Sequence, residues 1–348
     1  MENKYHPAYK NDMTHPRDWI EVRPEGLYCA AGEFYIDPVR PVARAIITHG
    51  HADHARRGHG DVWATAPTHA IMAVRYGDDF CETRHVVDYH IQTNINSVKV
   101  WLAPAGHILG SAQAVLEYDG GRIVISGDYK RRADPTCELF KPIPCDVFVT
   151  EATFGLPVFQ HPDTQHELQK LLDSLALLPD RCHAVGVYAL GKCQRVMLEL
   201  RAMGYDKPYF LHGAMIKLCD LYRDHGMDFG ELIPVSEVDK NDLIGQIVFC
   251  PPSALADRWA RKLPNVLTAM ASGWMQIRAR AKQRLVELPL IISDHADWAE
   301  LLQTLADVNA PEVWVTHGRE DALVYQARKL GYTAQALSLL GYEEDEST

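Results

Sequence analysis

The first half of the chain has short apolar runs separated by turn residues, a pattern that is typical of β-strands. The runs are rich in Val, Ile, Tyr and Trp, and Gly, Pro, Asp or Asn interrupt them. The sequence EYDGGR at residues 117–122 predicts a hairpin turn. The strand-like runs lie within residues 26–37, 41–49, 61–67, 97–104, 114–128 and 145–153.

The middle of the chain changes to helical periodicity. Apolar residues recur at helical spacing in residues 164–178, 192–204, 214–226 and 253–263. Short strand-like runs lie between these segments, in residues 183–190, 207–213, 246–252 and 265–273. Such alternation predicts a small parallel α/β unit. Residues 288–308 and 311–332 then return to a strand–loop–helix pattern.

Composition places the chain among ordinary globular enzymes of one or two domains. It has 348 residues, of which 47% are hydrophobic and 23% charged. No run of 18 apolar residues and no signal-peptide pattern is present, so we expect a cytoplasmic protein without a membrane span. The eight scattered cysteines, none in a C-x-x-C pair, predict reduced and mostly buried thiols.

The formal net charge of −11 argues against a broad basic surface that coats nucleic acid. It leaves room for a local cationic groove, and two divalent cations would add about four positive charges at one point.

Several polar residues come directly after a strand-like run. These are His49 after ARAIIT, Asp128 after RIVISG, Glu151 after DVFVT, His295 after LIISD and His317 after EVWVT. Ends of neighbouring strands converge in space, and loops there carry functional sites on a rigid scaffold. Residues far apart in the sequence are therefore expected to share one cleft.

The densest of these motifs is HGHADH, which contains His49, His51, Asp53 and His54. A turn of this kind can aim two imidazoles at one cation and the Asp–His pair at a second. Neutral imidazole and carboxylate suit zinc, manganese or iron. Any one of these residues alone is more often a hydrogen-bonded loop residue, but the combined pattern predicts a metal site. The residues expected to complete it are His107, Asp128 as a bridge between two metals, and His317.

Taken in order, the motifs resemble those of the metallo-β-lactamase-fold hydrolases, and more narrowly of the β-CASP nucleases. FYID with Asp37, HGHADH, GHILGSAQ and SGDYK resemble four motifs of the fold. VTEATFG, SDHADW and VTHG resemble the three additional β-CASP motifs. The size of the chain and the segments GKCQR and ASGWM are most similar to bacterial ligase-associated DNA exonucleases, also described as RNA 3′-end processing exonucleases.

This resemblance covers nearly the whole chain and implies an α/β fold. Residues 1–162 and 288–348 would form the two parts of an αββα metallo-β-lactamase sandwich. Residues 163–287 would form a compact, inserted β-CASP-like α/β lobe.

The resemblance also implies a role for each motif residue. One metal would be held by His49, His51 and His107, the other by Asp53, His54 and His317, and Asp128 would bridge them. Two divalent ions, zinc first with manganese or iron as alternatives, would then act on a bridging hydroxide. Asp37 would orient a ligand imidazole. His295, oriented by Glu151, would contact the scissile phosphate or protonate the leaving oxygen.

Four basic groups are candidates for substrate binding. They are Lys130 to Arg132, Arg56 with Arg57, Lys192 to Arg195 at a predicted helix start, and the cations of residues 278–284. A helix start with Lys192 and Arg195 predicts a phosphate cradle, whereas the last group fits a solvated helix face equally well. Ser272 and Gly273 could bring backbone amides to a phosphate. Trp274 could stack a base or belong to the core.

The resulting prediction is a two-metal phosphodiesterase, first of all a DNA exonuclease in DNA repair that is functionally associated with a DNA ligase. An RNA-processing nuclease is the alternative, because many DNA-specific members of the family lack a histidine in the last motif, where this chain has His317. A small-molecule hydrolase of the same fold and an inactive nucleic-acid-binding scaffold are weaker alternatives. The inserted lobe argues against the hydrolase, and the complete ligand set argues against the scaffold.

Overall fold

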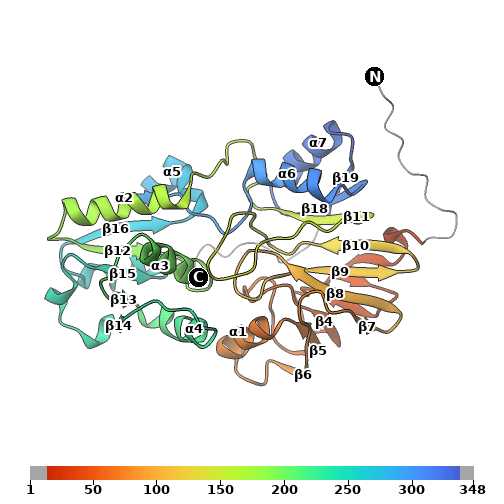
Figure 1. Cartoon of the computed structure of the whole chain (residues 1–348), viewed down its shortest axis with the longest axis horizontal. Helices are drawn as coiled ribbons and strands as arrows, with labels where there is room; N and C mark the ends of the chain where they lie inside the picture. The colour runs from red at the N-terminus through yellow and green to blue at the C-terminus, as the bar shows by residue number, and fades with distance from the viewer. Residues whose placement is uncertain (1–13, 338–348) are drawn as a thin grey trace. The chain divides into compact units, whose positions relative to one another are not determined.

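The computed structural model describes residues 14–337, which fall into two compact units (Figure 1). The first unit contains the described residues up to Arg132, then Leu139–Val158 and the described residues from His295 on. The second unit contains Ala133–Glu138 and Phe159–Asp294.

Two sheets form the centre of the first unit. One sheet has the order β1-β2-β3-β4-β5-β6 and the other the order β19-β18-β11-β10-β9-β8-β7. The strands of the first sheet are β1 (Ile20–Arg23), β2 (Gly26–Cys29), β3 (Phe34–Ile36), β4 (Arg44–Ile46), β5 (His59–Ala64) and β6 (Cys81–Val86). Those of the second are β7 (Thr93–Ile95), β8 (Val98–Pro104), β9 (Ala112–Tyr118), β10 (Gly121–Ile125), β11 (Val147–Ala152), β18 (Glu312–Gly318) and β19 (Thr333–Ala336).

The pairing of Gly121 with Tyr118 joins β9 and β10 as an antiparallel hairpin and confirms the predicted turn. Beyond this hairpin the ladder becomes parallel, from β10 through β11 and β18 to β19.

Hydrophobic clusters show that this unit has four layers. Leu27 and Ile36 of the first sheet pack in one cluster with Val100 and Ile125 of the second, so the two sheets lie face to face. The helix α1 (Ala66–Tyr76) covers the outer face of the first sheet, where Met72 packs against β4 and β5. The helices α6 (Trp298–Val308) and α7 (Glu320–Lys329) cover the outer face of the second. The predicted αββα sandwich is confirmed.

Local sequence signals start and stop the covering helices. Asp297 caps α6 and forms a reciprocal capping box with Glu300. The same helix ends at Asn309, which adopts the left-handed conformation that closes many helices. Thr65 caps α1, and a proline occupies its first turn. A short 3-10 helix, η1 (Pro16–Asp18), precedes β1.

The second unit is a parallel α/β sheet with the order β14-β13-β15-β12-β16-β17. Its strands are β12 (Cys182–Gly186), β13 (Tyr209–Leu211), β14 (Leu232–Pro234), β15 (Ile247–Cys250), β16 (Val266–Ala271) and β17 (Leu288–Leu290). Its α-helices are α2 (Thr164–Leu177), α3 (Lys192–Ala202), α4 (Gly213–Asp224) and α5 (Arg278–Gln283). The 3-10 helices are η2 (Val235–Glu237), η3 (Lys240–Leu243), η4 (Pro252–Ala256), η5 (Ala260–Lys262) and η6 (Gly273–Gln276).

One helix expected in this unit is absent from the structure. Residues 253–263 form the two 3-10 turns η4 and η5, because the backbone becomes extended at Asp257 and divides the segment. No helix among residues 14–337 is long and apolar enough to span a bilayer.

Candidate metal centre

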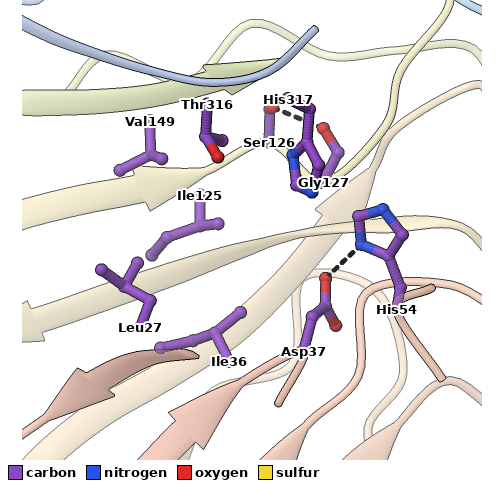
Figure 2. A pocket seen from close by; sticks show the side chains of 10 residues that line it. All are labelled: Leu27, Ile36, Asp37, His54, Ile125, Ser126, Gly127, Val149, Thr316 and His317. Atoms are coloured by element: carbon purple, nitrogen blue, oxygen red, sulfur yellow. Dashed lines mark hydrogen bonds and ion pairs between the residues drawn. The ribbon is translucent and has the colours of Figure 1, made fainter. Parts of the chain in front are cut away.

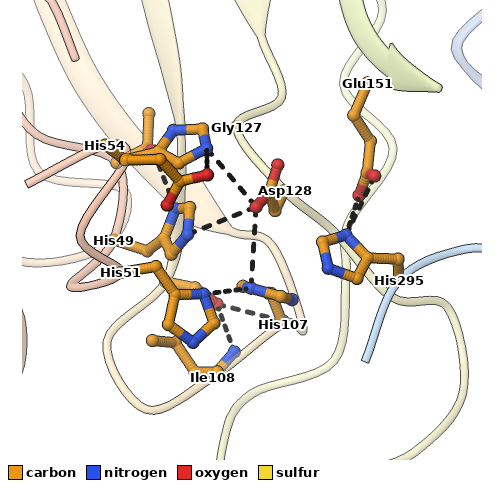
Figure 3. Close-up of polar contacts among 12 residues, drawn as sticks. His49, His51, His54, His107, Ile108, Gly127, Asp128, Glu151 and His295 are labelled. Atoms are coloured by element: carbon orange, nitrogen blue, oxygen red, sulfur yellow. Dashed lines mark hydrogen bonds and ion pairs between the residues drawn. The ribbon is translucent and has the colours of Figure 1, made fainter. Parts of the chain in front are cut away.

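The expected ligands lie in the first unit, in loops and strand ends of both sheets. Asp37 follows β3, residues 49–54 follow β4, His107 follows β8, Asp128 follows β10, and His317 belongs to β18. Figure 3 shows His49, His54 and His107 directed toward Asp128. The convergence that the strand ends predict is therefore present in the fold.

The first cluster of potential ligands is formed by His49, His51, His107 and Asp128. Their ligand atoms all lie within 4.8 Å of one another. The Nε2 atom of His107 is 2.9 Å from Nδ1 of His51 and 3.8 Å from Oδ2 of Asp128. His49 directs its Nε2 atom to the same carboxylate oxygen, at 3.4 Å.

The second cluster contains His54, His317 and again Asp128. The Nε2 atom of His54 lies 3.4 Å from Oδ2 of Asp128. Asp53 lies at the side of this cluster, with its Oδ2 atom 3.7 Å from Nε2 of His54. Asp128 is thus common to both clusters, which is the position expected of a residue that bridges two metals.

The distances from Asp128 to His49 and His54 fit cations better than direct hydrogen bonds, whereas the 2.9 Å between His107 and His51 is a hydrogen-bond distance. Two ligands at about 2.1 Å from one tetrahedral zinc are roughly 3.4 Å apart, which is the spacing of Asp128 from His49 and from His54. An N–H···O hydrogen bond is typically shorter, about 2.9 Å. The Nε2 atom of His49 is buried and makes no hydrogen bond with the described residues. The donor set therefore fits divalent cations.

The protonation states expected for His107, His317 and Asp128 suit metal binding. Burial lowers the pKa of His107 well below its ordinary value and that of His317 to about 4. Burial acts to raise the pKa of Asp128, but the nearby charges of His54 and His49 hold it well below its ordinary value. Neutral imidazoles and an ionised carboxylate are the forms that bind a cation. Burial acts to lower the pKa of His54, but the charges of Asp128 and Asp53 raise it well above its ordinary value, so a cation bound there must displace a proton.

Behind the ligands, Asp37 accepts three hydrogen bonds. Its Oδ1 atom accepts from the amide of Thr48 at 2.7 Å, and its Oδ2 atom accepts from the Thr48 hydroxyl at 2.6 Å. Oδ2 also accepts from Nδ1 of His54 at 2.8 Å (Figure 2). The Thr48 hydroxyl in turn lies 3.1 Å from Nδ1 of His49.

This network directs Nε2 of both histidines toward Asp128. The expected orienting position of Asp37 agrees with this geometry. Thr48 was missed, although it directly precedes the HGHADH motif.

Left-handed backbone conformations hold the ligand turns. Asp37 has φ +44° and His317 has φ +57°, values that are uncommon for residues other than glycine. Gly127, just before Asp128, has φ +55°, and a Cβ there would lie 2.7 Å from the Thr48 hydroxyl. Strained backbone of this kind concentrates at functional sites.

Glu151 and His295 form a pair beside the ligand clusters (Figure 3). Nδ1 of His295 lies 2.9 Å from Oε2 of Glu151 and 3.1 Å from Oε1. Glu151 also accepts from the amide of Tyr129 and the hydroxyl of Thr153, so its position is fixed. Burial raises the pKa of Glu151, and His295 opposes this shift. The ring of His295 lies 4.6 Å from that of His107, which places the pair next to the first cluster.

Of the first basic group, Lys130 is fully buried, whereas Arg131 and Arg132 are partly exposed. Arg132 donates to Asp297 at 3.0 Å and to Glu300 at 2.8 Å, at the start of α6. These residues tie the Asp128 loop to α6, and the described contacts give no support to the expected phosphate contact of Lys130.

Arg195, expected at a phosphate cradle, is instead buried in the second unit. Its guanidinium donates to Glu199 Oε1 at 2.7 Å, Thr164 Oγ1 at 2.7 Å, Ser293 O at 2.8 Å and Asp294 Oδ1 at 3.2 Å. Lys192 is also buried, with Nζ 3.5 Å from Oδ2 of Asp294. These contacts favour a structural role for Arg195, because its donors already have acceptors.

Ser272 and Gly273 are buried at the end of β16. The Ser272 amide donates to Leu290 O, and its hydroxyl accepts from the amide of Trp274 at 3.3 Å. The amide of Ser272 is thus already used within the sheet, and a phosphate contact at these two residues stays a prediction. Trp274 is half-buried and packs edge-on against Phe159.

Comparisons with known proteins agree with the fold. Residues 37–186 match the model of the metallo-beta-lactamase superfamily. The chain is 29% identical, over 92% of its length, to a probable DNA ligase of Opitutus terrae. It is 31% identical, over 49% of its length, to the endoribonuclease YSH1 of Gibberella zeae. It spans 31% and 25% of the lengths of these relatives.

A solved structure has the same fold. The crystal structure of a protein of unknown function from Enterococcus faecalis V583 matches 86% of this chain and 80% of its own, with a TM-score of 0.57 and 14% sequence identity.

Residues 37–186 therefore form a metallo-beta-lactamase domain, and the similarity to an endoribonuclease YSH1 is consistent with the β-CASP resemblance of the motifs. The superfamily fold implies divalent metal ions, and the histidine and aspartate clusters provide ligands that can bind them.

Proposed function

We propose that the protein is a two-metal phosphodiesterase that degrades DNA from an end, in DNA repair. The observation that carries this proposal is the pair of ligand clusters that share Asp128, with Glu151 and His295 beside them. We assign one metal to His49, His51 and His107 and the other to His54, His317 and Asp53, with zinc as the first candidate and manganese or iron as alternatives. Two cations held there would acidify water near neutral pH and neutralise charge on the phosphoryl oxygens.

The residues of the chain then have distinct tasks. Asp128, as the common ligand, keeps the two sites at a fixed separation. Asp37 and Thr48 hold the Nε2 atoms of two histidines toward Asp128. Nδ1 of His295 faces Glu151, so Nε2 of His295 is the atom that can hold a proton for the departing oxygen. The Glu151 carboxylate stabilises the imidazolium in this state and fixes the ring.

The domain assignment belongs to the same proposal. Residues 1–162 and 288–348 would supply the metal centre, and residues 163–287 would be an inserted lobe that contributes to substrate selection. Localisation in the cytoplasm also stays a prediction.

DNA is the first choice of substrate because the relative that aligns with 92% of the chain is named a probable DNA ligase. Because of the same similarity, we include a functional association with a DNA ligase in the proposal. RNA is the second candidate. A relative named an endoribonuclease matches 49% of the chain, and His317, in a motif where many DNA-specific members lack a histidine, belongs to the second cluster.

The test is hydrolysis of matched single-stranded DNA and RNA, each labelled at the 5′ or the 3′ end, with Zn²⁺, Mn²⁺ or Mg²⁺. We expect faster hydrolysis of DNA, with products that shorten progressively from one end. Faster cleavage of RNA would establish the alternative. No cleavage of either polymer, or of a nitrophenyl phosphodiester, with any of the metals would contradict the phosphodiesterase assignment.

A further inference from the structure

An open groove crosses one face of the sheet in the second unit. Its volume is about 860 Å³, within the range of pockets that hold ligands. Alternate residues of β16, among them Val266 and Met270, form its floor, because side chains two apart on a strand share a face. Leu255 of η4 and Val286 after α5 add apolar surface. We call this surface the β16 groove.

The charge of the groove has one sign. Arg261, Arg280 and Arg284 line it, and none of its described lining residues is acidic. Two of these arginines come from the fourth basic group of the sequence, for which a solvated helix face was the alternative interpretation. A purely solvated face would not turn two of its cations toward one apolar groove. In a chain with a formal net charge of −11, this local arrangement favours an anionic ligand.

One of these arginines, Arg280, is packed against an aromatic ring. The guanidinium of Arg280 lies 4.1 Å above the ring centre of Trp274. Trp274 is itself fixed by an edge-on contact with Phe159, at 5.1 Å between ring centres. A planar guanidinium held against an aromatic ring has its fork oriented in advance, which reduces the entropy lost on binding a phosphate.

Leu285 supplies a second, independent observation. It lines the same groove, its side chain is 82% exposed, and its φ is +54°. The left-handed conformation costs free energy at a leucine, and it places an exposed apolar side chain in the lining of the groove. A ligand with an apolar face would cover the side chain.

We propose that the β16 groove binds a segment of the single-stranded nucleic acid substrate, with arginines on its phosphates and the apolar floor against sugars and bases. The proposal rests on the proposed function, which brings such a strand to the protein. A single strand combines regular negative charge with exposed apolar base faces. An acidic peptide matches the charge, but arginine forks fit phosphate oxygens, and the substrate already supplies these.

Binding of fluorescein-labelled oligothymidylate to the full chain in EDTA tests the proposal by fluorescence anisotropy at several salt concentrations. The double variant Arg261→Gln/Arg284→Gln should bind about tenfold more weakly. The slope of the logarithm of the binding constant against the logarithm of the salt concentration should fall in magnitude by about 1.4, since each phosphate contact on a single strand contributes about 0.7. The charge-matched control Lys217→Gln/Lys240→Gln removes two exposed lysines of the same unit and should change the slope far less.

Leu285→Asn provides a variant that keeps the fold, because asparagine tolerates the left-handed conformation. It should weaken oligothymidylate binding without lowering the melting temperature. Equal affinities and salt slopes for wild type and all variants would overturn the proposal. Binding of oligoglutamate that the arginine variant loses, with oligothymidylate binding intact, would also overturn it and assign the groove to an acidic protein segment.

Hydrolysis of bis(p-nitrophenyl) phosphate separates this outcome from failure of the proposed function. This small diester needs the metal centre and does not extend to a second site. For each protein, kcat/KM for oligothymidylate is divided by kcat/KM for the diester. If wild type hydrolyses the diester and the arginine variant has the same ratio as wild type, the groove proposal fails and the phosphodiesterase assignment stands. If no diester is hydrolysed, the assignment fails.

Discussion

Asp37 binds no metal in our assignment, yet its three hydrogen bonds fix two histidines of the centre. Asp37→Ala should therefore lower metal affinity by about 10–100-fold, the usual effect of removing a partner of a ligand histidine. Thr48→Val should have a smaller effect, and Thr48→Ser should retain affinity because its hydroxyl can still connect His49 to Asp37. Competition with a chromophoric chelator measures the affinities. Wild-type affinity in both Asp37→Ala and Thr48→Val would show that the network has no such role.

His295 allows chemistry to be separated from metal binding. His295→Ala should keep the full metal content and lower kcat by about 10²–10⁴-fold, the range for a lost general acid. A nitrophenyl phosphodiester should recover part of this loss, because its leaving oxygen needs less protonation. Glu151→Gln should show the same behaviour more weakly, since it acts through the imidazole.

Metal analysis and kinetics on the two leaving groups provide the measurement. Loss of a metal in His295→Ala would make His295 a ligand. Equal decreases in kcat for substrates with good and with poor leaving groups would mean that His295 binds the phosphate and transfers no proton.

At the residue scale, the sequence was informative about which histidines and aspartates converge and less so about the basic side chains. The convergence of His49, His107 and Asp128 could be predicted because each follows an apolar strand, and strand ends converge. The buried environment of Arg195 could not be predicted, because Asp294 and Thr164, which accept hydrogen bonds from its guanidinium, are far from it in the sequence. A basic residue at a helix start looks the same in a sequence whether phosphate or protein carboxylates neutralise it.

The conformation at the end of β18 determines where the backbone of His317 lies. Gly318 follows His317, has φ +92°, and a Cβ there would lie 2.3 Å from the carbonyl oxygen of Ala152. Gly318→Ala should lower the melting temperature and reduce metal content at the second cluster, because the backbone of His317 must move.

Gly331→Ala is the matched control, since Gly331 has φ +98° and nothing within 4 Å of its Cβ position. It should carry only the conformational cost, about 1–2 kcal/mol. Melting curves and metal content of the two variants provide the comparison. Equal effects would mean that the close approach to Ala152 has no part in placing His317.

Element by element, strong periodicity and clear turn signals gave correct predictions, and weak signals did not. The β9–β10 hairpin and the helices α2, α3, α4 and α6 follow from apolar spacing and turn residues. The segment 253–263 has helical spacing, but tertiary packing divides it into η4 and η5. The helix α1 was missed because ATAPTH at its start reads as the end of a strand, although Thr65 and the following proline are helix-start signals.

For the molecule as a whole, bound metals should contribute to stability, because they bind the folded state. A ligand at 1,000 times its Kd stabilises by about 4.1 kcal/mol, which corresponds to roughly 10 °C for a domain of this size. Treatment with EDTA should lower Tm by this order, and added Zn²⁺ should restore it. Asp128→Ala should show a much smaller response. A wild-type Tm that EDTA leaves unchanged after the metals are removed would contradict this link between the centre and the fold.

The central claim is that Asp128 joins two metal sites into one hydrolytic centre, and metal content measured together with turnover tests it most directly. Elemental analysis of the wild-type chain should give about two divalent ions per chain, with hydrolysis of a phosphodiester. Asp128→Ala should lose at least one of these ions and all measurable hydrolysis, because both clusters lose their common carboxylate. Near-normal turnover in Asp128→Ala, with two metals still bound, would contradict the account.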